Sequence, residues 1–129
     1  MADLKYNSIA LIAQNLAVDF SLTTDLSLYT VPTGKEFTPF AVCISKISAT
    51  LATATVTFGE SGSKTDFLDT QALTNITTAG AAIWLMPVPS ATPAREIITY
   101  VAGDVFTMDR VVADSATADV SVFGFLNDA

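Results

Sequence analysis

The chain has 129 residues, half of them hydrophobic, with only 15% charged and a mean hydropathy of +0.48. This length fits one domain, and the apolar excess is more than a compact monomer can hide, so we expect self-association. The net charge of −7 and six scattered basic residues argue against nucleic-acid binding, which needs a basic stripe.

Histidine is absent and cysteine occurs once, so the chain lacks the commonest general base and the usual transition-metal ligands. Cys43 lies in the apolar stretch 40–44, without a partner for an intrachain disulfide. We interpret it as a small buried hydrophobe of a protein that folds in a reducing cytoplasm. The longest apolar run, 79–86, is far shorter than the roughly 20 residues of a membrane span, and no signal-peptide core is evident.

The first 15 residues are interpreted as an N-terminal arm and possible edge strand, followed by a β-sandwich domain over 16–129. An extended arm can pair its backbone with a neighbour and place alternate side chains in grooves. Residues 9–13 could instead form an ordinary edge strand of the chain's own sandwich. The apolar side chains that we expect to contact a partner are Leu4, Tyr6, Ile9, Leu11 and Ile12.

Alternation of apolar and polar residues predicts strands through the first half of the chain. It is clearest over 52–58, where the even positions are apolar and the odd ones are threonine. Pro32 and Gly34 predict a tight turn with a positive φ at Gly34. Pro39 predicts an edge position or a strand entry. The candidate strands are 9–13, 16–22, 26–31, 37–48 and 52–58.

The second half begins with a segment that is hard to assign. Residues 59–65 have the composition of a loop, and 66–76 have a spacing that a short helix could use, with Asp66 as its N-cap. Gly103 lies in a predicted tight turn between two strands. Eight or nine short strands with little helix predict an all-β sandwich or barrel. The later candidate strands are 82–86, 96–101, 104–112 and 119–126, with a proline- and serine-rich loop at 87–94.

Two polar patterns have a functional interpretation and a simpler structural one. The segment 59–65 is similar to a phosphate-binding loop, but Ser63 replaces its last glycine and no α/β alternation surrounds it. Glu60, Asp66 and Asp69 could crowd around a Ca²⁺ ion or form a solvated acidic loop. We favour the structural interpretation of both.

Four aspartates recur every five residues: Asp104, Asp109, Asp114 and Asp119. Five is an odd step along a strand, so they cannot share one sheet face, and we expect them at turns and strand ends. No facing pair of carboxylates suggests a glycosidase. Trp84 is expected in the core or at a subunit interface, with a sugar-stacking platform as the alternative.

Three stretches resemble parts of small virion proteins of tailed bacteriophages. Residues 27–37 are similar to their opening strand-turn-strand, 100–106 to a later hairpin and 118–126 to their closing strand. The resemblance implies a single jelly-roll-like antiparallel β-sandwich of about eight strands with at most one short helix. It also implies a capsid decoration (cement) protein, commonly a homotrimer, with no catalytic residues and no cofactor.

The expected function is therefore structural. The protein would bind the outer surface of the major capsid protein lattice, after synthesis in the host bacterial cytoplasm, with no nucleic-acid or membrane partner. The alternative is a tail, collar or host-receptor/carbohydrate-binding β-sandwich component of the virion. Pro32, Gly34 and Gly103 are expected to serve only as structural turns.

Overall fold

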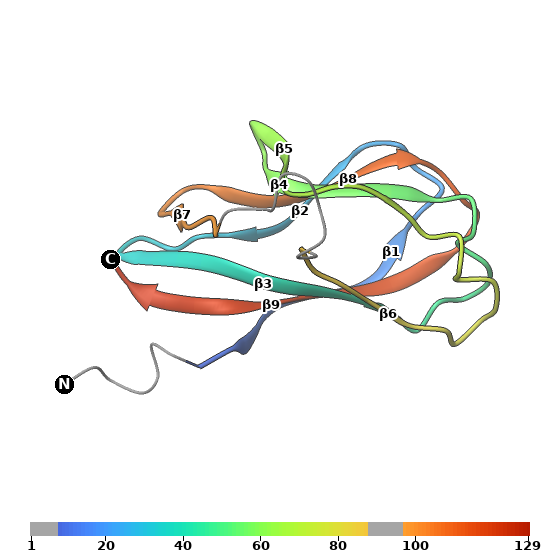
Figure 1. The fold of residues 1–129 in the computed structure, drawn as a ribbon, viewed down its shortest axis with the longest axis horizontal. Coiled ribbons are helices and arrows are strands. Elements are labelled where there is room, and N and C mark those ends of the chain that lie inside the picture. The colour runs from blue at the N-terminus through green and yellow to red at the C-terminus, as the bar shows by residue number, and fades with distance from the viewer. Residues whose placement is uncertain (1–7, 88–96) are drawn as a thin grey trace.

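The computed structural model describes residues 8–87 and 97–129, and these residues form β-strands without any helix (Figure 1). The prediction of an all-β chain is confirmed. In chain order the strands are β1 (Ala10–Asp19), β2 (Asp25–Thr30), β3 (Lys35–Ser45), β4 (Thr55–Glu60), β5 (Ser63–Ala72), β6 (Ile83–Leu85), β7 (Tyr100–Val101), β8 (Val105–Val112) and β9 (Thr117–Asp128).

The strands form two antiparallel sheets that face each other as a sandwich (Figure 1). One sheet has the order β1-β9-β3-β6, with β7 also paired to β3, and the other has the order β2-β8-β4-β5. β6 and β7 occupy one position beside β3, so each sheet has four positions. This is the eight-strand, two-sheet plan of a jelly roll, as the resemblance to virion proteins implied.

β6 and β7 are the two halves of one interrupted strand. Leu85 pairs with Val42 and Tyr100 with Phe37, so a step of fifteen residues on one strand spans a step of five on β3. The chain between the halves therefore carries ten residues more than continuous pairing would need. Pro87 lies at this break and has no N–H for a ladder.

The expectation that Pro39 marks a strand entry or an edge is wrong, because β3 is a central strand. Pro39 is tolerated there for two reasons. β3 has a register shift between Pro39 and Ala41, which is a bulge. On the side away from β9, the pairing of β3 with β7 ends at Phe37 and that with β6 begins at Val42.

The candidate strands 9–13 and 16–22 are one bulged strand, β1. Its pairing with β9 shifts between Asn15 and Val18, and Ala17 has a φ of 50° in this bulge. The Ala17 N–H donates a hydrogen bond of 2.9 Å to Oδ1 of Asp119 on β9. A carboxylate therefore satisfies the backbone group that the bulge removes from the ladder.

The loop expected at 59–65 and the helix considered for 66–76 are both wrong, because β4 and β5 form a hairpin. Glu60 pairs with Ser63, which leaves only two residues in the turn. Asp66 does not cap a helix: its Oδ1 accepts hydrogen bonds from the Glu60 N–H and from the Tyr100 hydroxyl. The similarity to a phosphate-binding loop therefore has no helix to support it.

An aromatic cluster fills the core between the sheets. Phe106 of β8 lies at its centre, with ring centroids 5.5–6.2 Å from those of Phe37, Phe58, Phe67 and Tyr100. All five side chains are buried. These rings come from both sheets, so the cluster fixes how the sheets pack.

The two expected glycine turns have the following geometry. The φ of Gly34 is 77° and that of Gly103 is 89°. The Lys35 N–H donates to the Pro32 carbonyl at 3.2 Å, which closes the turn between β2 and β3. The Asp104 N–H donates to the Val101 carbonyl at 3.0 Å, which closes the turn between β7 and β8.

Candidate functional site

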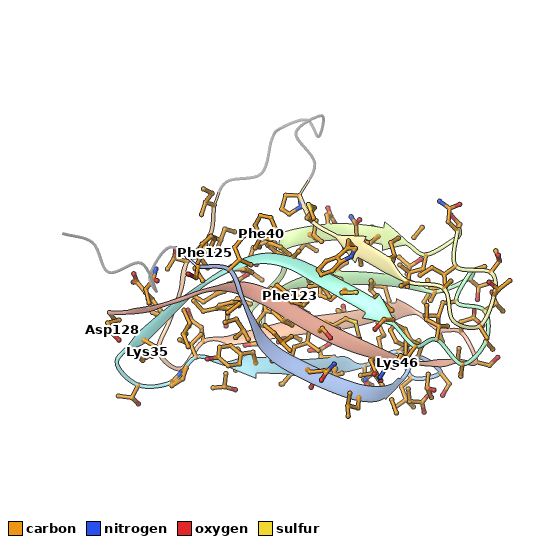
Figure 2. All side chains as sticks on the ribbon, turned by 90° about the horizontal axis from the view of Figure 1, so that it is seen from below. Lys35, Phe40, Lys46, Phe123, Phe125 and Asp128 are labelled. Carbon is orange, nitrogen blue, oxygen red and sulfur yellow. The ribbon has the colours of Figure 1, made fainter. Side chains whose placement is uncertain are left out.

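The outer surface of the β1-β9-β3-β6 sheet carries large apolar side chains. Paired residues share one side of a sheet, and Leu11 pairs with Phe123 while Cys43 pairs with Trp84. The rings of Trp84 and Phe123 approach to 5.0 Å between centroids. Figure 2 looks onto this side, where Phe40, Phe123 and Phe125 are labelled. We call this surface the aromatic face, defined by Leu11, Phe40, Cys43, Trp84, Phe123 and Phe125.

Several side chains of the aromatic face are open to solvent. The exposed fraction is 52% for Leu11, 43% for Phe40 and 55% for Trp84. Large exposed apolar patches on soluble proteins mark interaction sites. The aromatic face is therefore the candidate functional surface of this chain.

The corresponding side of the other sheet has polar cross-strand pairs, although Val111 and Val112 at the end of β8 are exposed. Asp109 of β8 pairs with Asp25 of β2 and with Thr57 of β4, while Ser27 pairs with Thr107. The Lys64 Nζ lies 2.6 Å from Oδ2 of Asp25, an ion pair between β5 and β2. This side has polar cross-strand pairs where the aromatic face has rings, so the two sheets are suited to different surroundings.

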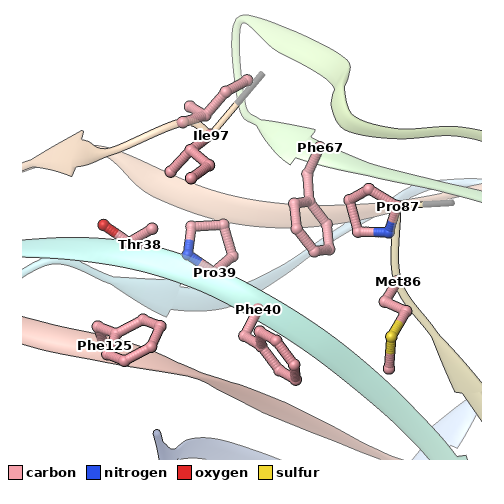
Figure 3. A pocket seen from close by; sticks show the side chains of 9 residues that line it. Thr38, Pro39, Phe40, Phe67, Met86, Pro87, Ile97 and Phe125 are labelled. Atoms are coloured by element: carbon pink, nitrogen blue, oxygen red, sulfur yellow. The ribbon is translucent and has the colours of Figure 1, made fainter. Parts of the chain in front are cut away.

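A hollow of about 280 Å³ opens at the break between β6 and β7 (Figure 3). Phe67 of β5 is one wall, and Ile97, which is 88% exposed, stands at its rim. The Thr38 and Thr99 hydroxyls meet at 2.9 Å beside it. The hollow adjoins the aromatic face, with which it shares two residues. Its lining is Thr38, Pro39, Phe40, Phe67, Met86, Pro87, Ile97, Ile98 and Phe125.

The partner-binding residues expected in the arm fall into three groups. Ile9 and Leu11 are exposed, at the start of β1. Ile12 is half-buried and packs against the core. Leu4 and Tyr6 lie outside the described residues. β1 is an edge strand paired with β9, which is the place that the competing interpretation gave to residues 9–13.

Trp84 and Cys43 are less buried than the sequence indicated. Trp84 was expected in the core or at a subunit interface, and the core position is wrong, because β6 turns Trp84 outward and buries Leu85 instead. Cys43 is half-buried, and partial burial raises the pKa of its thiol. Sequence reasoning missed Phe123 and Phe125 as surface residues. The signal was present in the sequence. Both residues have odd numbers, whereas the core residues Val120 and Val122 have even numbers, and alternate residues of a strand point to opposite sides of the sheet.

Tyr100 cannot be a sugar-stacking platform, since only 2% of it is exposed. Its hydroxyl donates a 2.6 Å hydrogen bond to Asp66, and burial is the main reason that the pKa of this phenol is raised. Asp66 is thus held by structural bonds. Among residues 8–87 and 97–129 no group of three His, Cys, Asp or Glu side chains is placed to hold a metal ion.

The regularly spaced aspartates are only partly where the sequence indicated. Asp104 and Asp114 lie outside the strands, and hydrogen bonds from the Thr53 and Ser115 backbone lower the pKa of Asp114. Asp109 and Asp119 lie within β8 and β9, so the expectation of turns and strand ends is wrong for these two. Asp119 is used at the β1 bulge, which no spacing rule predicts.

Arg110 is buried among polar backbone groups. Its guanidinium donates to the Asp19 carbonyl at 2.6 Å and to the Thr24 carbonyl at 2.9 Å. These bonds fix the connection between β1 and β2 onto β8, so we assign Arg110 a structural role. In the part of the chain that the structure describes, no helix could cross a membrane.

No family model and no curated protein matches this sequence. Two solved structures share its fold. One is a chain from the acidic stable capsid of Helicobacter pylori bacteriophage KHP30, with 14% identity and a TM-score of 0.51, covering 95% of this chain and 97% of that one. The other is a chain of the cyanophage Pam1 capsid asymmetric unit, with 17% identity, a TM-score of 0.52, and coverage of 91% and 84%. This sandwich is therefore a fold found in chains of two bacteriophage capsids.

Proposed function

We propose that this chain is a structural virion protein that decorates and stabilises a bacteriophage capsid. In this proposal it binds the outer surface of the major capsid protein lattice and catalyses no reaction. It is made in the host bacterial cytoplasm and resides on the capsid surface. The observation that carries the proposal is the aromatic face, on a fold shared with two capsid chains.

A broad apolar face suits a lattice better than it suits a small ligand. Stable protein interfaces bury roughly 1,200–2,000 Å² in total, and aromatic side chains near their centre contribute most of the binding free energy. The rings of Trp84 and Phe123 lie together on the aromatic face. Ile9 and Leu11 extend the face along the β1 edge. We assign these residues to the contact with a partner.

A second candidate is carbohydrate or host-receptor binding by a tail or collar component. It is favoured by Trp84, whose exposed ring beside Phe123 has the chemistry of a sugar-stacking platform. A lattice contact and a sugar contact would both use this ring. The two candidates differ in the partner that covers Trp84, which is a capsid in the first and a glycan in the second.

The test is binding of the isolated protein to capsids that lack it. Trp84→Ser removes the largest exposed ring and is expected to weaken co-sedimentation at least about tenfold, equivalent to about 1.4 kcal/mol. The matched control is Val111→Ser, which removes an exposed apolar side chain from the other sheet. Both variants should have melting temperatures close to that of the parent protein.

Cys43 gives a second readout. It is the chain's only cysteine and pairs with Trp84 on the aromatic face. Its alkylation by a maleimide should slow when the protein is bound to capsids. Unchanged alkylation together with undiminished capsid binding by Trp84→Ser would contradict the proposed face. Protection of Cys43 by a glycan, without capsid binding, would favour the second candidate.

A further inference from the structure

The N-terminal segment 1–7 has the pattern of an extended strand with one apolar side. In an extended chain, alternate side chains point to opposite sides. Leu4 and Tyr6 then lie on one side, together with Ala2, whereas Lys5 and Asn7 lie on the other. Such a segment binds an apolar groove with one side and meets water with the other.

The chain leaves β1 without turning. Ser8 and Ile9 are neither turn nor bend, and no glycine or proline occurs before Pro32. β1 runs antiparallel to β9 and Ala10 pairs with Gly124, so Ser8 and Ile9 lead toward the C-terminal end of β9. Fully extended, seven residues reach roughly 24 Å, which suffices to meet a neighbouring molecule.

The hollow at the break between β6 and β7 is the matching receptor. Its lining side chains are apolar apart from Thr38, and its volume of about 280 Å³ suits a few side chains rather than a large ligand. Met86 and Phe40 at its wall are both exposed. β3 is not paired with β6 or β7 over 38–41, at the place where the hollow lies.

Charge does not oppose the contact between copies. From Ser8 to Val18 the chain has no charged residue, and the lining of the hollow has none. Edge strands of monomeric proteins are commonly protected by charged side chains or proline, which β1 lacks before its last residue, Asp19. The β1 edge and the lining of the hollow therefore place no charged side chains of their own in the contact.

From these observations we infer that residues 1–7 of one copy dock in the hollow of a second copy, with Leu4 and Tyr6 against Phe40 and Met86. A contact between an arm and a different site on the next copy is heterologous, and it forms a ring if the rotation closes. The inference deepens the self-association that the apolar composition predicts, and it does not depend on capsid binding. It is measured without capsids, so its failure and the failure of capsid binding are distinguishable.

The first experiment compares assembly of three proteins by sedimentation velocity. The full chain is expected to assemble at micromolar concentration, and Leu4→Ser combined with Tyr6→Ser should be monomeric. Lys5→Ser, on the opposite side of the segment, is the control and should assemble normally. A monomeric full chain, or a double variant that assembles like it, would overturn the inference.

The second experiment separates exchange between copies from an arm that folds onto its own chain. Phe40→Ser combined with Met86→Ser removes the receptor but keeps the arm, and should also be monomeric. This receptor variant is then mixed with the arm variant, in which Leu4→Ser and Tyr6→Ser are combined. The mixture should give a one-to-one heterodimer in native mass spectrometry, because the intact arm of the receptor variant meets the intact hollow of the arm variant. Absence of this heterodimer would overturn the exchange.

A peptide experiment tests the same inference even if the receptor variant, in which Phe40→Ser and Met86→Ser are combined, does not fold. The synthetic peptide of residues 1–7 is added to the folded arm variant, and emission from Trp84, the chain's only tryptophan, is followed. Trp84 is two residues from Met86 in the hollow, so docking should shift the emission. A serine-substituted peptide is the control. No shift with the unsubstituted peptide would overturn the inference.

Discussion

Two residues other than glycine have a positive φ in the described chain, Ala17 and Lys46, each at 50°. Both lie near Asp119. Oδ1 of Asp119 accepts the Ala17 N–H, and its Oδ2 lies 4.0 Å from the Lys46 Nζ. A left-handed backbone costs an L-residue roughly 1–2 kcal/mol, which a hydrogen bond to a carboxylate can offset. The Asp119 carboxylate thus stabilises the β1 bulge at Ala17.

Replacing Asp119 should destabilise the fold. Asp119 is 7% exposed, and Asp119→Ala leaves the Ala17 N–H unsatisfied, with an expected loss of roughly 1–3 kcal/mol in the free energy of unfolding. Asp119→Asn keeps an oxygen acceptor and should lose less. Urea denaturation measures both. Equal stability of the alanine variant and the parent would show that the bulge does not depend on this bond.

Gly34 offers a test of backbone strain alone. A Cβ at Gly34 would meet nothing within 4 Å, and its φ of 77° is unfavourable for a β-branched residue. Gly34→Val should therefore lower the free energy of unfolding by roughly 1–3 kcal/mol without any clash. Gly34→Asn is the control, because asparagine tolerates this region better. An unchanged melting temperature for the valine variant would contradict the assignment.

Most strands could be predicted from sequence, including β2 and β3 with their bulges, whereas β5 could not. The candidate strand at 119–126 lies within β9, where Val120 and Val122 belong to the core and Phe123 and Phe125 are less buried. β5 was missed because Phe67 and Leu68 are consecutive and both buried, and because its pairing with β4 is interrupted by register shifts. A bulge breaks the period of two, which is the only local signal of a strand.

The sequence predicted that the chain has an apolar contact surface, but it did not predict where in the fold this surface lies. The apolar excess indicated that some surface is covered by another chain, and the structure places the exposed aromatic side chains Phe40 and Trp84 on one sheet. Phe40 could not be located, because it lies at the bulge after Pro39. The hollow depends on Phe67 and Ile97, thirty residues apart, so no local pattern could have indicated it.

The Tyr100–Asp66 bond links β7 to β5 across the sandwich and gives the fold a dependence on alkaline pH. Burial raises the pKa of the Tyr100 phenol above its ordinary value of 10.0, so the folded chain keeps this proton while the unfolded chain loses it. The contribution is fully present below pH 10 and is lost as the pH rises further. We expect the free energy of unfolding to fall above pH 10.

Tyr100→Phe is the matched variant for this dependence. It should be less stable by roughly 1–2 kcal/mol at neutral pH, because Asp66 loses a hydrogen-bond donor. Above pH 10 its stability should fall less steeply than that of the parent protein. Urea denaturation at several pH values measures both effects. Parallel pH profiles would contradict the assignment to Tyr100.

At the scale of the whole molecule, the two sheets give the sandwich one aromatic and one polar side. We expect the isolated chain to be a homotrimer, because a closed ring buries the same apolar surface on every copy. Sedimentation equilibrium at micromolar concentration should give three times the mass of the 13.6 kDa chain. A stable monomer would contradict this prediction, and a dimer would require a different symmetry.

The interrupted strand beside β3 has a consequence for how such a protein can change over time. β6 and β7 are each held in register by their own pairs with β3, on either side of the extra residues. Doubling the length of such a segment adds only about 0.6 kcal/mol of loop-closure free energy. Insertions, deletions and new sequences can therefore accumulate between Pro87 and Ile97 while the jelly roll keeps its shape. This position is where descendants of the chain are free to diverge.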